Sequence, residues 1–154
     1  MGIKRLEIAG FKSIDGIELT DLPNYCVFAG ANGAGKSNFF DALKFTSAII
    51  DVGAFKAIRQ FQGYERIHCV KRRKDKATTF RFVCDIESPR YGADYFLQVR
   101  QMDQMPELQE RLTVSYPNES KLRCVRGPDG MMRINNIEMG RHLRDYSIMK
   151  EDFP

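Results

Sequence analysis

The sequence contains no tryptophan, only two histidines and no long apolar run. No stretch approaches the ~20 apolar residues that a transmembrane helix needs, so a membrane-spanning helix is excluded. The first residues alternate between charged and apolar side chains, unlike a secretory signal, and we expect a cytoplasmic protein. With 154 residues, 43% of them hydrophobic, the chain can build the core of one domain with an appended lobe and is too apolar for a disordered segment.

The four cysteines lack the short spacings of a metal-binding or redox motif. Cys26, Cys69, Cys84 and Cys124 lie far apart, each in an apolar, strand-like stretch. His68 stands beside Cys69, but two neighbouring residues do not form the four-ligand site of a structural zinc ion. We therefore expect no metal there, and buried, reduced thiols as in an intracellular protein.

The chain has little excess charge of either sign: 24 Lys and Arg oppose 20 Asp and Glu, for a net charge of +4. Nearly all of this excess lies in one run, KRRKDK at 71–76. Two interpretations remain open for Lys71, Arg72, Arg73 and Lys74: contact with DNA phosphates, or a solvated hairpin tip between strands. No aromatic residues alternate with these charges, which favours the hairpin tip over a surface for stacking bases.

Apolar periodicity predicts the elements of the first half. Alternation indicates a strand over 3–11, a turn near 15–16 and a short returning strand at 17–19. The run YCVFA at 25–29 is short and continuously apolar, which is typical of a strand buried on both faces. After it the period becomes helical, because Phe39, Leu43, Thr46 and Ile50 share one face. The spacing predicts one helix over 37–51, an end or bend at Gly53, and a short second helix over 54–61.

The second half alternates with a period of two. Short turns join its segments, and no helical period separates them, so we predict an antiparallel sheet with one solvated face. The predicted strands are 80–86, 95–99, 108–116, 122–125 and 131–134, with a turn at 127–130 before the last of them.

Residues Gly30 to Ser37 read GANGAGKS and match the pattern G-x-x-x-x-G-K-[ST] between a predicted strand and a predicted helix. Glycines allow a tight turn whose backbone N–H groups point inward at the start of a helix, which makes an anion site. In such a loop the lysine, here Lys36, reaches the β- and γ-phosphates. The hydroxyl, here of Ser37, completes the coordination of Mg²⁺. The sequence therefore predicts a site for a nucleoside triphosphate.

The sequence around this loop resembles a known family. Residues 30–43 read GANGAGKSNFFDAL and residues 10–14 read GFKSI. Together they resemble the opening of ABC-type P-loop ATPases of the SMC/RecF/OLD branch, densely over residues 1–50 and only architecturally beyond. The resemblance implies an α/β (α+β) fold, the N-terminal half of a P-loop NTPase. It implies a nucleotide-binding subdomain (1–61), an antiparallel β-lobe (62–137) and the start of a following segment (138–154).

The resemblance also implies which residues form the site. ATP and Mg²⁺ are the expected cofactors, with Lys36 as the catalytic residue and Ser37 as the magnesium ligand. Lys12 and Ser13 are expected beside the nucleotide, although an ordinary exposed strand end fits them equally well. The full set expected to hold the triphosphate is Gly30, Ala31, Asn32, Gly33, Ala34, Gly35, Lys36, Ser37 and Asn38.

Other motifs that this family uses for hydrolysis are not recognisable in the sequence. The run FVCDIE at 82–87 ends in acids like a Walker B strand, but Arg81, Asp85 and Glu87 share one side, which marks a half-exposed antiparallel strand. Nothing around Gln98 singles it out as a glutamine loop, nor is there a signature serine-glycine motif. We therefore expect the N-terminal part of a longer ATPase, and little hydrolysis by this chain alone.

Three functions follow as hypotheses. The first is the ATP-binding portion of an ABC-type ATPase head, with hydrolysis in a full-length homodimer coupled to DNA maintenance, repair or antiphage defence. The second is a small P-loop kinase, which would need later α/β units that the alternating segments do not resemble. The third is a non-catalytic interaction module that keeps the P-loop fold.

Overall fold

The computed structural model describes residues 1–72, 79–102, 105–127, 131–135 and 137–141. In these described residues, eight strands form one sheet in the order β2-β1-β3-β4-β5-β6-β7-β8, and all neighbours pair antiparallel. The strands are β1 (Gly2–Phe11), β2 (Ile14–Leu22), β3 (Thr79–Glu87), β4 (Gly92–Met102), β5 (Met105–Ser115), β6 (Lys121–Arg126), β7 (Met131–Ile134) and β8 (Ile137–Arg141).

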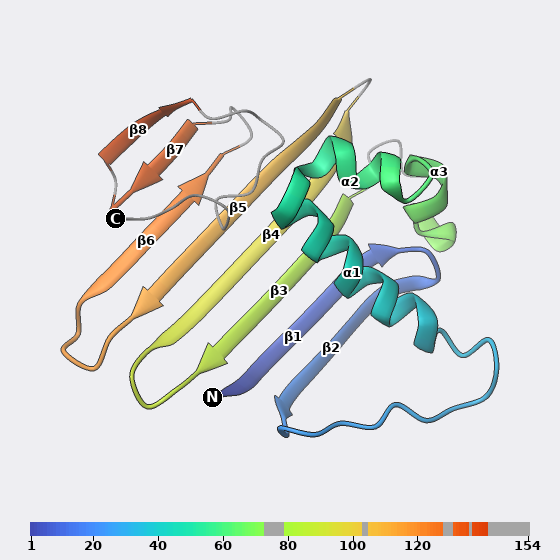
Figure 1. The fold of residues 1–154 in the computed structure, drawn as a ribbon, viewed down its shortest axis with the longest axis horizontal. Helices are drawn as coiled ribbons and strands as arrows, with labels where there is room; N and C mark the ends of the chain where they lie inside the picture. The colour runs from blue at the N-terminus through green and yellow to red at the C-terminus, as the bar shows by residue number, and fades with distance from the viewer. Residues whose placement is uncertain (73–78, 103–104, 128–130, 136, 142–154) are drawn as a thin grey trace.

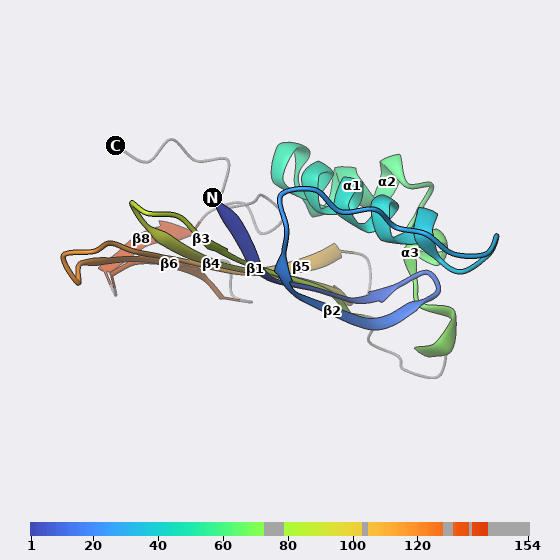
Figure 2. The same ribbon diagram turned by 90° about the horizontal axis from the view of Figure 1, so that it is seen from below.

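The helices come from the segment between β2 and β3. They are α1 (Lys36–Val52), α2 (Ala54–Gln60) and α3 (Tyr64–Ile67), followed by the short 3-10 turn η1 (Val70–Arg72). Figures 1 and 2 show α1 and α2 on one side of the sheet, where α1 contacts β1 and α2 contacts β5. The molecule is therefore a mixed α/β structure with one antiparallel sheet, as the alternation predicted, and the sheet is covered by helices over part of one face.

The predicted helices are confirmed to within two residues at each end. α1 ends at Gly53, whose φ of 85° suits glycine and whose N–H donates to the Ile49 carbonyl at 3.0 Å. The predicted strands of the second half are also confirmed, with offsets at their ends, whereas the patterns missed α3, η1 and β8. These three elements are only three to five residues long, too short for a period to stand out.

Two irregularities in β1 explain its uneven pattern. The register against β3 shifts between Ile3 and Arg5, which moves the next inward side chain to Leu6. Gly10 has a φ of 78°, and this bend returns Phe11 to the core side after Ile8. Local breaks in the pleat thus explain why apolar residues are three positions apart at each end of β1, at Ile3 and Leu6 and again at Ile8 and Phe11, although the strand otherwise alternates.

Four phenylalanines form the centre of the core between sheet and helices. The ring of Phe45 on α1 lies 5.6 Å from Phe11, 5.2 Å from Phe61 and 5.0 Å from Phe80, measured between centroids. Phe11, Phe45 and Phe80 are at most 4% exposed. Edge-on and tilted aromatic contacts at these distances add to the stabilisation from burial. One aromatic cluster therefore joins β1, α1, the end of α2 and β3.

A smaller cluster lies at the other end of the sheet. Cys124 and Met132 are its buried members, and partly buried Leu112 and Ile134 pack against them. Beside it, the buried Arg126 and Glu110 lie 3.9 Å apart, Nη1 to Oε2. The hydroxyl of Tyr95 donates to the other oxygen of Glu110 at 2.7 Å. This end of the sheet thus buries an ion pair where the first end buries aromatic rings.

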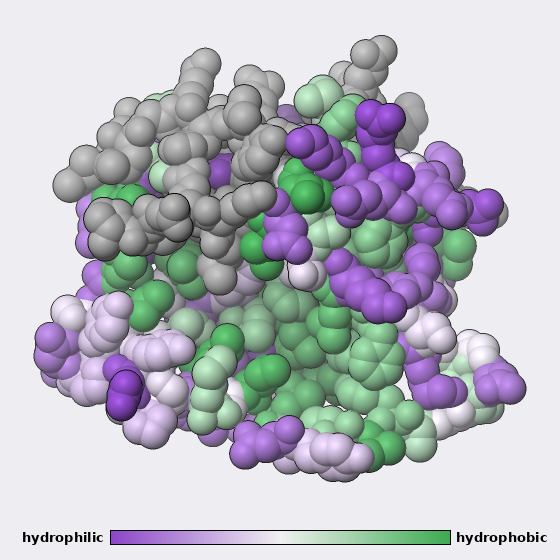
Figure 3. Space-filling view, viewed as in Figure 1, coloured by the Kyte–Doolittle hydropathy of each residue, from purple (hydrophilic) through white to green (hydrophobic). Residues whose placement is uncertain are grey.

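The predicted strand at 25–29 is wrong. These residues are described but belong to no strand, and Tyr25 and Val27 are 82% and 73% exposed. Within the described part of the chain, no strand lies beside them to supply the hydrogen bonds that a buried strand needs. The preceding strand, β2, lies at the edge of the sheet and, among the described strands, pairs with β1 alone. Figure 3, viewed as in Figure 1, shows hydrophobic surface in the lower middle of this face of the molecule.

Two smaller expectations also need correction. The first turn lies at Lys12-Ser13 and not at 15–16, because Lys12 adopts a left-handed φ of 49° and Gly16 is already paired with Ala9 in β2. Cys26 is exposed and not buried, since its segment lacks a neighbouring strand, and the half-buried Cys84 lies between these extremes.

The sheet runs continuously through the expected boundary at 61/62, because β1 pairs with β3 from the second half. The division into a nucleotide-binding subdomain and a β-lobe stays a prediction. None of the helices in the described residues is both long and apolar enough to cross a bilayer.

Candidate functional site

The loop from Gly30 to Gly35 leads into the N-terminus of α1. Gly33 and Gly35 have φ angles of 84° and 93°, which residues with side chains rarely adopt. The N–H of Ala34 donates to the carbonyl of Ala31 at 3.2 Å, which closes a tight turn inside the loop. The glycines predicted from the pattern are therefore used where the chain turns most sharply.

The first turn of α1 is open to an anion. Gly35 is the N-cap of the helix, and no side-chain hydrogen bond caps this end among the described residues. The first turn carries no acidic residue, so the positive end of the helix dipole is not neutralised locally. Lys36 is the first residue of the helix, and its ammonium donates to the carbonyls of Gly30 at 2.5 Å and Ala31 at 2.8 Å. The lysine therefore folds back over the loop that precedes it.

A pocket of about 210 Å³ lies at this helix end. Its lining combines backbone N–H groups, an ammonium and the exposed hydroxyl of Ser37, a donor set that suits a phosphate chain with a hard cation. A side chain at Gly33 would meet no atom within 4 Å, so the loop leaves room on that side. The lining residues are Asn32, Gly33, Gly35, Lys36, Ser37 and Asn38.

The Lys12-Ser13 turn lies against the same helix end. The amide of Asn38 donates to the Ser13 hydroxyl at 2.7 Å. The same hydroxyl lies 3.5 Å from the position that a Cβ atom would take on Gly35. The structure thus brings Ser13 beside the loop, with Lys12 one residue away.

One residue of this cluster, Asp41, was missed by the sequence reasoning. Its carboxylate lies 2.6 Å from the Lys12 ammonium. The signal was available, because Asp41 follows Asn38 by three residues and so shares its face of the helix. The pair borders a cavity of about 470 Å³ whose other lining residues are Gln60, Phe61, Gln62 and Arg66.

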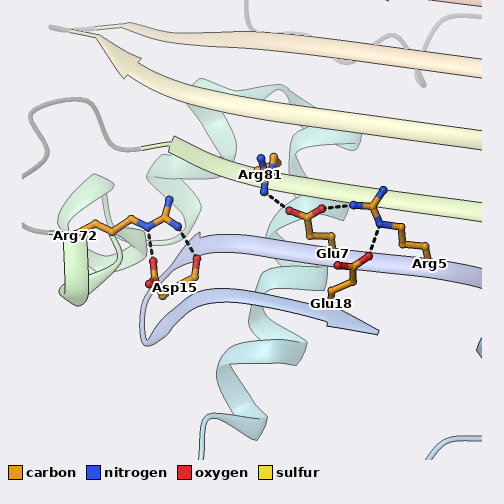
Figure 4. Close-up of polar contacts among 6 residues, drawn as sticks. All are labelled: Arg5, Glu7, Asp15, Glu18, Arg72 and Arg81. Carbon is orange, nitrogen blue, oxygen red and sulfur yellow. Dashed lines mark hydrogen bonds and ion pairs between the residues drawn. The ribbon is translucent and has the colours of Figure 1, made fainter. Parts of the chain in front are cut away.

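The basic run is only partly described. Lys71 is exposed, and Arg72 forms an ion pair with the carboxylate of Asp15 and donates to its carbonyl at 2.9 Å (Figure 4). Arg73 and Lys74 lie outside the described residues. The predicted hairpin tip between strands is wrong, because the run follows α3 and begins in η1, where Asp15 of β2 holds the guanidinium of Arg72. The predicted DNA contact remains a prediction.

The acids that were set aside as a Walker B decoy lie in β3, which has antiparallel neighbours on both sides. Burial and the nearby Asp94 carboxylate raise the pKa of Asp85, and Arg5 and Arg111 oppose them. Figure 4 shows an ion-pair network on the neighbouring strands, where Glu7 contacts both Arg5 and Arg81. Within the described part of the chain, no three His, Cys, Asp or Glu side chains group closely enough to hold a metal ion.

Comparison with known proteins gives matches to one family and to two bacterial relatives. A family model described as "AAA domain, putative AbiEii toxin, Type IV TA system" matches residues 26–126. Over 58 residues, the chain is 40% identical to the chromosome partition protein Smc of Synechocystis sp. and 41% identical to that of Synechococcus sp.. Each match covers 37% of this chain and 5% of the relative, so the chain spans a small part of these proteins.

The match to the family model covers more than half of the chain and includes the glycine-rich loop, α1 and strands β3 to β6. The similarity to Smc is consistent with the resemblance to the SMC/RecF/OLD branch that the motifs indicated. The chain therefore belongs to the family of AAA domains described as putative AbiEii toxins of Type IV toxin–antitoxin systems.

Proposed function

We propose that this chain is the ATP-binding part of an ABC-type ATPase head of the SMC/RecF/OLD kind. The observation that carries this proposal is the open N-terminus of α1, where a glycine loop, a folded-back lysine and a free hydroxyl surround one small pocket. These donors suit a phosphate chain, with the Ser37 hydroxyl available to the Mg²⁺ that accompanies it, and they do not suit an apolar ligand.

The roles of the residues follow from their positions. Residues 30–38 hold the triphosphate through backbone N–H groups, and Lys36 moves from the Gly30 and Ala31 carbonyls to the β- and γ-phosphates. Ser37 would hold Mg²⁺, which when bound neutralises charge on those phosphates. Ser13 lies next to this pocket through its hydrogen bond with Asn38, and we propose that Lys12 and Ser13 lie beside the bound nucleotide.

Hydrolysis, dimerisation and a role in DNA maintenance, repair or antiphage defence are proposed for a longer, homodimeric form of the protein. Support for this wider proposal comes from the similarity to Smc proteins, of which the chain covers 5%. DNA contact through 71–74 belongs to the same proposal. Replacing the basic residues of this run by neutral ones would then weaken DNA binding and flatten its dependence on salt, whereas unchanged affinity and slope would exclude the contact.

The test of nucleotide binding is a calorimetric titration of the full-length protein with Mg·ATP. Lys36→Ala is expected to abolish binding, because it removes the charge that faces the phosphates. Lys44→Ala is the matched control, since Lys44 is an exposed lysine further along the same helix. Unchanged affinity of the Lys36 variant would contradict the proposal. Transfer of phosphate to a small acceptor would favour a kinase, and no binding by the unmodified protein would favour a non-catalytic interaction module.

A further inference from the structure

Two side-chain contacts fasten the Lys12-Ser13 turn to α1. Asn38 donates to Ser13 at 2.7 Å, and Asp41, one turn later, pairs with Lys12 at 2.6 Å. Lys12 and Asp41 are both partly buried, with side chains 29% and 32% exposed. A short ion pair at this depth is screened less than a surface pair and has a defined geometry.

The turn itself is held rigidly from the other side. Lys12 has a φ of 49°, a conformation that a residue with a side chain adopts only when its surroundings require it. Its N–H donates to the Ile67 carbonyl at 2.9 Å, and its carbonyl accepts from the Val70 N–H at 2.8 Å. The turn is therefore a fixed point between the sheet and α1.

The glycine loop has no comparable support. Among the described residues, no hydrogen bond joins 30–35 to the sheet, and the bonds of the loop stay within it or reach α1. The segment before the loop lacks strand neighbours in the same part of the chain. Besides the apolar packing of Phe39, the start of α1 is thus held by the polar contacts of Asn38 and Asp41 with the Lys12-Ser13 turn.

We infer that Asp41 is a positioning residue of the phosphate site: by holding Lys12, it fixes the first turn of α1 in the orientation that receives the phosphates. The inference rests on the proposed nucleotide binding. The direction in which phosphate affinity changes distinguishes this role from a purely electrostatic effect of the Asp41 charge. Removing a negative charge near an anion site should tighten phosphate binding, whereas losing the anchor should weaken it because the helix end must then be ordered on binding.

The experiment measures the affinity of the full-length protein for Mg·ATP and for inorganic tripolyphosphate. Asp41→Asn is expected to weaken both about tenfold, a loss of about 1.4 kcal/mol, and Asp41→Glu is expected to restore most of it. Lys12→Met should weaken binding by a similar factor. The double variant should lose no more than either single one, because both remove the same link.

The matched control is Asp51→Asn, which removes the same charge from the last turn of the same helix and should leave both affinities unchanged. Thermal melts without ligand show whether each variant is folded. If Asp41→Asn does not fold, the affinities of Asp41→Glu and Lys12→Met are compared with that of the wild type instead. Wild-type or tighter binding by Asp41→Asn would overturn the inference. So would a loss confined to ATP, since that would place Asp41 at the nucleoside. No binding by the unmodified protein would instead refute the proposed function.

Discussion

The two ends of the sheet are stabilised in different ways. At the first end, β1, β3 and β4 pack against α1 and α2 through a large apolar cluster centred on Phe45. At the other end, β6 and β7 share a small cluster around Cys124 and Met132, beside a buried ion pair. Burial of apolar area is the main source of folding free energy. The difference implies that the end carrying the candidate phosphate site is the more stable one, and substitutions at both ends of the sheet test this.

The largest effect is expected from Phe45→Ala, which empties the centre of the aromatic cluster. Deleting a fully buried phenylalanine side chain typically lowers the free energy of unfolding by about 3–5 kcal/mol. Met132→Ala is the counterpart in the small cluster, where the partly buried neighbours can close the gap, and about 2 kcal/mol is expected. Denaturant unfolding measures both. Equal losses would show that the two ends contribute alike.

A loss of about 3 kcal/mol is expected for Glu110→Ala, because it leaves the Arg126 charge buried without its carboxylate and removes the acceptor of Tyr95. The double variant Glu110→Leu/Arg126→Met should recover most of the stability, since apolar residues of similar size can replace a buried pair. Urea midpoints of the three proteins are compared. A double variant as unstable as the single one would mean that the pair itself stabilises this end.

A smaller loss, about 2 kcal/mol, is expected for Gly10→Ala at the bend of β1. The residue has a positive φ, and a methyl group there would overlap the Thr79 carbonyl oxygen on β3. Gly16→Ala is the matched control on the neighbouring strand, because a methyl group at Gly16 meets no atom within 4 Å. The free energy of unfolding should change by less than about 0.5 kcal/mol in Gly16→Ala. A larger change in this control, or an unchanged free energy of unfolding in Gly10→Ala, would argue that the bend at Gly10 is not a fixed point.

The smallest effect concerns Asp85→Asn on the solvated side of β3. The raised pKa of Asp85 means that the folded protein holds this proton more tightly than the unfolded chain, so ionisation opposes folding. The penalty is absent below the ordinary aspartate pKa of about 3.9 and complete above the raised value. The variant should therefore melt at most about 3 °C higher at pH 7 and match the wild type at pH 3. The same gain at both pH values would exclude ionisation as its cause.

Much of this arrangement could be predicted from the sequence. The period of α1, the glycine at its end and the alternating strands are local signals, because each depends on which face of one element is buried. The glycine loop was predicted for the same reason: its pattern describes a local turn before a helix. Within the site, Ser13 and Asn38 were named in advance, and the structure brings them into contact.

The failures concern pairing between distant segments. The run 25–29 has the composition of a strand, but a strand forms only where another supplies hydrogen bonds, which composition does not reveal. The partnership of Lys12 with Asp41 spans 29 residues and depends on how α1 lies over β1. The bend at Gly10 and the buried position of Glu110 likewise depend on neighbouring strands.

The exposed segment 25–29 has a practical consequence for handling the isolated chain. A β-prone stretch with exposed side chains such as Tyr25 and Val27, which pairs with no strand in the described part of the chain, is a template on which a second copy can add a strand. We expect the purified chain to form aggregates that grow with concentration, visible by light scattering. A lysine in place of Val27 would act as a gatekeeper and delay them. We therefore expect the segment that leads to the phosphate loop to limit the solubility of the isolated chain.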